Sequence, residues 1–221
     1  MSKKKKIVLG ITIGVSSALV LAVLIPFVIL GIRTASLKKS YAYLKDDPVY
    51  SEKQEVAGIE LVKQEISCGY ATIEMMSTFY GNKISEKELS DKNNGSITTS
   101  SSDGFLKELR KSIPEQKFVK HSYLDNDVLL KEISIALSDN RPVALEWAAK
   151  YESEWTLHFS LVTSVDINND IVTIYNPYGY IENITVDEFI SRTSFEAYKN
   201  IPLFLNFGFA FGAFEKNTIF Y

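Results

Sequence analysis

The single cysteine of this 221-residue chain, Cys68, is the side chain best suited to covalent chemistry. It stands directly before the run GYATIEMMSTFY, whose apolar side chains recur at helical spacing, so a helix is expected to begin at the cysteine. The free amides and the dipole at a helix N-terminus stabilise a thiolate and lower its pKa from about 8.5. This placement predicts a nucleophile. The alternative interpretation is a small buried residue of the core.

A thiol nucleophile needs a base, and the chain has two histidines, His121 and His158. His158 begins the apolar run HFSLVTSVDI, whereas His121 lies in the polar stretch KFVKHSYLDND, so His158 is the candidate base. Asn176 ends the next apolar run, IVTIYN, and can orient the imidazole across a hairpin. Gln64 can donate its side-chain amide to an oxyanion beside the backbone amide of Cys68. Together these residues predict acyl chemistry at a thiol, although each one alone has a purely structural explanation.

The elements that must position these residues are helices first and strands second. Helices are predicted after Cys68, after the capping box of Ser85 and Glu88, around 105–111, and around 130–137. The runs PVALEWA, HFSLVTSVDI and IVTIYN then predict strands, the last two as a hairpin, followed by a short helix that Thr185 caps. Helices packed on an antiparallel sheet make an α+β fold.

The C-terminal run FLNFGFAFGAF alternates phenylalanine with small residues. A period of two predicts a strand with one aromatic face. The alternative is that these phenylalanines touch a membrane surface.

Composition excludes several classes of protein. One cysteine permits no intrachain disulfide, so a disulfide-stapled scaffold is excluded. Residues 35–221 carry 19 basic and 27 acidic side chains, a balance that does not suit nucleic-acid binding. Their length fits one compact domain. No metal or organic cofactor is expected.

The N-terminal segment predicts a membrane anchor. Residues 7–32 contain no charged side chain and, at about 1.5 Å per residue, give a helix of about 39 Å, which exceeds a hydrocarbon core of about 30 Å. Four lysines precede the run, so the positive-inside rule places the N-terminus in the cytoplasm and the domain outside the cell membrane. The alternative is a signal peptide cleaved near Thr34-Ala35-Ser36. The predicted organisation is a basic N-terminus at 1–6, a transmembrane helix at 7–32, a juxtamembrane linker at 33–56 and a catalytic domain at 57–221.

The motifs resemble a known family. The stretch VKQEISCGYATIEMMSTFYGNKIS, followed by PVALEW, LHFSLVTSVD and IVTIYNPYG, is similar to the bacteriocin-processing double-glycine cysteine peptidases and their stand-alone papain-like relatives. The resemblance implies a papain-like fold and cleavage of a peptide or protein substrate. It also implies that Gln64 is the oxyanion donor, Cys68 the nucleophile, His158 the base and Asn176 the orienting residue.

The chain departs from that family in three ways. Ser67 stands where an acid usually precedes the cysteine, and Asn176 stands where an aspartate is usual. An asparagine orients imidazole but brings no full charge to stabilise imidazolium. The family members that process bacteriocins are cytoplasmic domains of exporters, so the double-glycine leader is not carried over as the substrate of a domain expected outside the cell.

Two other functions compete with peptide-bond hydrolysis. One is a binding or scaffold protein that has the papain-like fold without turnover. The other is an acyl transferase that uses the same three catalytic side chains with an acceptor other than water.

Overall fold

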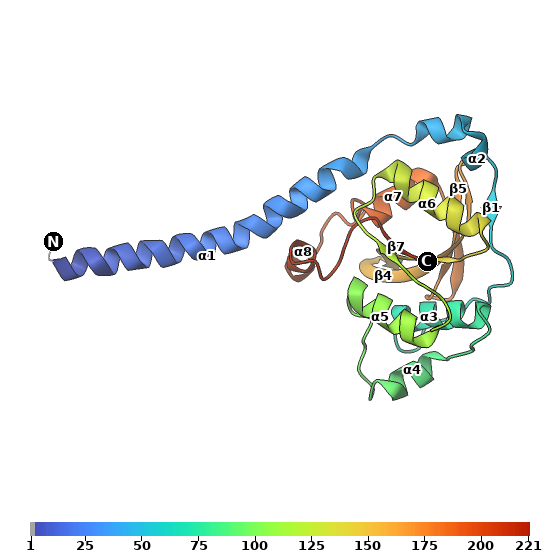
Figure 1. The fold of residues 1–221 in the computed structure, drawn as a ribbon, viewed down its shortest axis with the longest axis horizontal. Helices are drawn as coiled ribbons and strands as arrows, with labels where there is room; N and C mark the ends of the chain where they lie inside the picture. The colour runs from blue at the N-terminus through green and yellow to red at the C-terminus, as the bar shows by residue number, and fades with distance from the viewer. Residues whose placement is uncertain (1–2) are drawn as a thin grey trace.

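The computed structural model describes the backbone of residues 3–221, and their side chains except those of residues 3–16, 18, 19 and 36 (Figure 1). Its centre is an antiparallel sheet with the order β2-β7-β3-β4-β5-β6, and a short strand β1 pairs with β4. The strands are β1 (Gln54–Glu55), β2 (Lys120–His121), β3 (Val143–Tyr151), β4 (Glu154–Asp166), β5 (Ile171–Asn176), β6 (Tyr180–Ile184) and β7 (Thr218–Phe220).

Helices lie on both sides of this sheet. In Figure 1, α3, α4 and α5 lie below it and α6 and α7 above it. The helices are α1 (Lys3–Ala35), α2 (Pro48–Ser51), α3 (Cys68–Phe79), α4 (Glu86–Lys92), α5 (Ser102–Ser112), α6 (Asn126–Ser138), α7 (Val186–Thr193) and α8 (Leu203–Ala210). The α+β architecture predicted from the sequence is confirmed.

The core packs α3 and α5 against the central strands. Phe105 of α5 stacks on Phe159 of β4 with ring centroids 4.3 Å apart, and it also contacts Phe220 of β7. All three rings are buried, together with Tyr70 of α3 and Trp147 of β3. Burial of aromatic side chains this large dominates core energetics, so α3 is held firmly against β4.

Local signals place the N-terminus of α3 as the sequence predicts. The Ser67 hydroxyl accepts a hydrogen bond from the Tyr70 amide at 3.1 Å, and Cys68 is the first helical residue. At the other end Gly81 has φ of +87°, a left-handed conformation that glycine adopts without steric cost. The capping box of Ser85 and Glu88 and the hairpin of β4 and β5 are confirmed as well.

The prediction of a C-terminal strand in FLNFGFAFGAF is wrong. Residues 203–210 form the helix α8, with Pro202 as its N-cap residue. Leu205 and Phe209 are four residues apart and both buried, so they share one face of a helix. The C-terminal strand is β7, which lies between β2 and β3 in the sheet and which the sequence pattern did not reveal.

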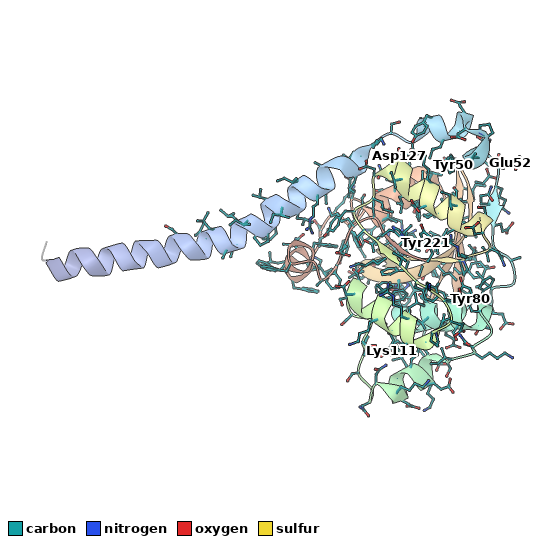
Figure 2. All side chains as sticks on the ribbon, in the orientation of Figure 1. Tyr50, Glu52, Tyr80, Lys111, Asp127 and Tyr221 are labelled. Carbon is teal, nitrogen blue, oxygen red and sulfur yellow. The ribbon has the colours of Figure 1, made fainter. Side chains whose placement is uncertain are left out.

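The segment predicted as a juxtamembrane linker packs against the domain. Leu44 and Val56 within it are buried in the main core, and β1 pairs with β4. At the start of α6, where Figure 2 labels Asp127, the carboxylate accepts a hydrogen bond from the Tyr43 hydroxyl at 2.6 Å and lies 2.9 Å from the Lys39 ammonium. Residues 37–56 are therefore docked on the sheet and on α6, which fixes the direction in which α1 leaves the domain.

The N-terminal helix α1 extends away from the globular part of the chain (Figure 1). Among the residues whose side chains are described, no helix has both the length and the apolar composition needed to cross a bilayer. The described side chains begin at residue 17, inside the predicted span of 7–32. The membrane anchor therefore stays a prediction.

Candidate active site

The structure brings the predicted site residues to one cavity of about 310 Å³. Gln64, Cys68 and His158 line it, and Asn176 lies directly behind the histidine. The remaining lining residues are Ser67, Ile97, Thr99, Ser100, Leu157, Phe159, Tyr178 and Phe214. The cavity therefore joins the N-terminus of α3 to β4, to the turn after β5 and to the segment after α8.

Cys68 is partly exposed as a residue and lines the cavity, while its thiol is closely surrounded by protein atoms. Desolvation by the surrounding side chains raises the pKa of the thiol to about 11, although the backbone amides of Phe159, Gly69 and Cys68 itself act in the opposite direction. The expected lowering of the pKa by the helix N-terminus is thus outweighed in the free protein. The thiol is protonated at rest and must lose its proton when it reacts.

His158 is buried, and Tyr178 covers its ring with a centroid separation of 4.1 Å. Desolvation lowers the pKa of the imidazole to about 3, the hydrogen bond to Asn176 raises it, and the charge of Arg192 lowers it further. Both members of the pair are therefore neutral at rest. Among the described residues there is no hydrogen bond between the thiol and the ring, although both face one cavity.

The hydrogen bonds of Asn176 determine the tautomer of His158. Asn176 Oδ1 lies 2.9 Å from His158 Nε2 and accepts a second hydrogen bond from the Tyr178 amide. Its Nδ2 donates to Glu182 Oε1 at 2.6 Å, which assigns the oxygen to the histidine side. An amide oxygen can only accept, so Nε2 carries the proton and Nδ1 is the basic nitrogen.

A buried ion pair lies behind Asn176, and the sequence pattern did not predict it. Arg192 of α7 bonds the Glu182 carboxylate at 2.6 and 3.3 Å and donates from Nε to the Ala148 carbonyl at 2.9 Å. Its guanidinium lies 3.6 Å from the centroid of the Trp147 ring. One feature of the sequence could have placed Glu182 close to Asn176. This is the turn at Pro177–Gly179, after which the chain returns as β6.

Gln64 is positioned by its backbone, because its N–H donates to the Pro177 carbonyl at 2.7 Å. Its side-chain oxygen is buried without a hydrogen-bond partner, and within the described part of the chain its side chain bonds no other residue. The amide that faces the cavity is therefore available to a ligand.

Glu86 organises the loop that leads into Cys68, a role that the sequence pattern did not predict either. Its buried carboxylate accepts hydrogen bonds from the amides of Glu65, Ile66 and Ser67 at 2.7, 3.0 and 2.6 Å. Its own amide donates to Glu74 of α3. One side chain thereby fixes the loop between Gln64 and Cys68.

A second buried carboxyl group lies close enough to the thiol to influence its charge. Glu146 of β3 is fully buried, and desolvation raises its pKa to about 8. Ser102 donates to one carboxyl oxygen, and among the described residues the other oxygen has no hydrogen-bond partner of ordinary geometry. A negative charge on Glu146 raises the pKa of Cys68. Nowhere among the described side chains do three metal-binding residues cluster.

Comparison with known proteins places these observations in a family. No curated protein sequence matches this chain significantly. A solved C39-like peptidase from Bacillus anthracis is 12% identical, covers 64% of this chain and 95% of its own, and has a TM-score of 0.46.

Two further solved structures are similar to the same degree. A double-glycine motif protease from an AMS/PCAT transporter, in complex with its leader peptide, is 16% identical over 63% of this chain and 91% of its own, with a TM-score of 0.45. The peptidase domain of Streptococcus ComA, a bifunctional ABC transporter, is 15% identical over 74% of this chain and 97% of its own, with a TM-score of 0.47.

The sequence pattern of one family matches residues 50–202, which include all four predicted site residues and most of the sheet. The chain belongs to the Peptidase_C39 like family.

Proposed function

We propose that this protein is a cysteine peptidase in which Cys68 attacks the carbonyl carbon of a peptide bond and His158 Nδ1 receives the thiol proton. The observation that carries the proposal is the shared cavity of Cys68 and His158, with Asn176 bonded to the far side of the imidazole. Family membership supports the same reaction class.

The reaction consists of two acyl-transfer steps. The sulfur adds to the carbonyl carbon, and the oxyanion receives hydrogen bonds from the Gln64 side-chain amide and the Cys68 backbone amide. His158 then gives its proton to the leaving amine, which leaves a thioester on Cys68. Water, deprotonated by His158, attacks the thioester and restores the thiol.

The reaction begins from a neutral thiol on Cys68 and a neutral imidazole on His158, not from a thiolate–imidazolium ion pair. A thiol with a pKa of about 11 and an imidazole with a pKa of about 3 do not exchange a proton in the free protein. Proton transfer must therefore accompany the attack on the substrate. This gives a low background reactivity toward thiol reagents, a property that suits a lone cysteine outside the cytoplasm.

We also propose that the peptidase domain is anchored outside the cytoplasm by residues 7–32. The uncharged sequence of this run, the four lysines before it and its place within one long helix support the anchor. The substrate is then a peptide or protein of the cell envelope rather than a leader presented to a cytoplasmic domain.

Labelling of the full chain in detergent tests the chemistry. A peptidyl epoxide probe is expected to modify Cys68, and labelling should vanish in Cys68→Ala and fall strongly in His158→Ala. His121→Ala is the matched control, because His121 stacks on Tyr221 outside the cavity and its loss should leave labelling unchanged. Equal labelling of the two histidine variants would contradict the proposed base and favour a scaffold without turnover.

The topology has a separate test in intact cells. In a Cys68→Ser background, a membrane-impermeant maleimide should label Glu52→Cys, at a position that is exposed on the domain. Ser2→Cys should be labelled only after the membrane is opened. The reverse pattern would place the domain in the cytoplasm.

A further inference from the structure

The helix α8 exposes more large apolar surface than a short element of a water-facing domain normally does. Leu203 and Phe204 are each 69% exposed, Phe211 just beyond the helix is 63% exposed, and Phe207 is 37% exposed. Residues 201–214 contain no charged side chain. Large exposed apolar patches mark sites of association with a protein, a ligand or a membrane.

The opposite face of α8 is packed on the domain. Leu205 and Phe209 are buried against Phe195 and Ala148, and the Phe209 ring lies 4.7 Å from the Phe195 ring. The domain thus holds the helix in place with its phenylalanines turned outward. Exposure of these rings is therefore a property of the folded chain.

The position of α8 relative to α1 indicates what covers this face. The Phe27 ring of α1 meets the Phe207 ring of α8 edge to face at 5.8 Å, and Figure 1 shows α8 on the side of the domain from which α1 extends. Phe27 precedes Ile32, the end of the uncharged run, by five residues, which corresponds to about 7.5 Å along a helix. If residues 7–32 are in a bilayer, α8 lies at the depth of about 5–10 Å at which interfacial helices reside.

We propose that α8 is an interfacial helix that inserts Phe204, Phe207 and Phe211 into the lipid bilayer beside α1. This inference rests on the proposed membrane anchor and adds to it a second, independent contact between the domain and the lipid. The contact fixes the orientation of the domain, because a single helix alone allows rotation about its own axis. The residues of α8 follow the stretch 50–202 that matches the family pattern.

The same helix forms part of the support of the active-site cavity. A Cβ on Gly208 of α8 would lie 2.5 Å from the ring of Phe214, and Phe214 lines the cavity with Cys68. The cavity is therefore close to the proposed lipid contact. We expect substrates whose scissile bond lies close to the membrane surface, such as the extracytoplasmic ends of membrane proteins.

A bilayer explains the patch better than a second copy of the chain does. The exposed phenylalanines are continuous with the exposed apolar side chains of α1, among them Val28 at 59% and Ile32 at 70%. The two elements also share a groove, which is lined by Pro26, Ile29 and Leu30 of α1 and by Phe209 and Phe211, with Arg33 and Tyr123 also in its lining. A protein partner on α8 alone would leave this shared surface in water, whereas lipid covers both parts.

Spin labelling of the full chain in vesicles tests the proposal. The Cys68→Ser background contains no cysteine, so one nitroxide can be placed at Phe204→Cys or at Phe211→Cys. The chain is reconstituted in equal parts of phosphatidylcholine and phosphatidylglycerol, and collision with oxygen is compared with collision with a water-soluble nickel chelate. Labels on α8 should be reached by oxygen and protected from nickel.

Matched controls separate this inference from the anchor. Labels at Val49 and Ile171, which are 65% and 42% exposed on the domain and do not line the cavity, should be open to nickel. A label at Leu24 reports on α1. If the label at Leu24 is in lipid and the label at Phe204 is in water, the interfacial helix is refuted and the anchor is retained. If both labels are in water, both proposals are refuted. A Phe204 label protected from both reagents overturns the lipid contact in favour of a protein neighbour such as a second copy.

Discussion

The carboxylate of Glu182 accepts a hydrogen bond from Nδ2 of Asn176 at 2.6 Å, so a negative charge stands directly behind the amide that orients His158. The family resemblance indicated an aspartate at the position of Asn176, whose neutral amide seemed unable to stabilise imidazolium. The structure places the acid one residue further from the imidazole and pairs it with Arg192.

This arrangement predicts that Asn176→Asp lowers activity, although aspartate is the residue usual in the family. The new carboxylate would face Glu182 at hydrogen-bond distance, and two like charges this close disfavour each other's ionised form. We expect kcat/KM to fall by about tenfold or more, which corresponds to about 1.4 kcal/mol. Steady-state hydrolysis of a peptide substrate measures the effect.

A second substitution tests the reason for that loss. Adding Glu182→Gln to Asn176→Asp removes the repulsion and leaves the new carboxylate at position 176 as the acid near Arg192. The activity of the folded fraction should largely recover, a coupling that a double-mutant cycle quantifies. An increase of activity in Asn176→Asp alone would show that Glu182 does not act on the site.

The ion pair of Arg192 and Glu182 should support the fold as well as the site. The arginine is 3% exposed, and removing one partner of a buried pair costs about 3–5 kcal/mol because the other charge is left buried. Arg192→Met is therefore expected to lower the free energy of unfolding by several kcal/mol in urea titrations. Arg141→Met is the control, because its ion pair with Asp139 is exposed and should contribute less than about 1 kcal/mol.

The neutral resting pair predicts a particular pH dependence of thiol alkylation. With the pKa of Cys68 raised to about 11, the thiolate fraction and hence the iodoacetamide rate should rise about tenfold per pH unit between pH 7 and pH 9. A rate that is already constant from pH 5 to pH 8 would reveal a preformed ion pair with His158 and refute the neutral pair.

Glu146 makes stability depend on pH with a predictable sign. Its pKa is raised from 4.5 to about 8 on folding, so the folded state binds more protons than the unfolded state between these values, and its contribution to stability is lost as pH rises through this window. Glu146→Gln should therefore gain stability relative to the original chain between pH 4.5 and pH 8.5, in urea titrations at the two pH values. A difference that is constant with pH would mean that Glu146 is ionised throughout.

Glu86 gives a test of how the nucleophile is positioned. Glu86→Ala removes the acceptor of three loop amides and should lower kcat by tenfold or more, because the loop from Gln64 to Cys68 loses its anchor. Glu88→Ala removes the exposed capping box of the same helix and should leave kcat unchanged, with only a small loss of stability. Equal kinetics for the two variants would show that the loop is held by other contacts.

The parts of the fold that the sequence predicted are those fixed by neighbours along the chain. Ser67 caps α3 through a residue three positions away, and the hairpin of β4 and β5 closes over a short turn. The placement of Cys68, His158 and Asn176 followed from these two elements.

Other features depend on contacts between distant residues and could not be predicted. The three residues of β7 pair with β3 from more than 60 positions away, and nothing in TIF specifies that place. The phenylalanines at 207, 209 and 211 fit a period of two, yet burial of Leu205 with Phe209 selects the helix. Glu182 and Glu86 reach the site only after the chain has folded back on itself.

The central claim is that Cys68 becomes acylated with the help of His158. The most direct measurement is mass spectrometry of the full chain after brief reaction with p-nitrophenyl acetate. We predict an acetyl group on Cys68 that hydroxylamine removes at neutral pH, that forms much more slowly in His158→Ala and that forms at the original rate in His121→Ala. Absence of a thioester on Cys68 would show that Cys68 is not the nucleophile, and formation at the same rate without His158 would show that His158 is not the base.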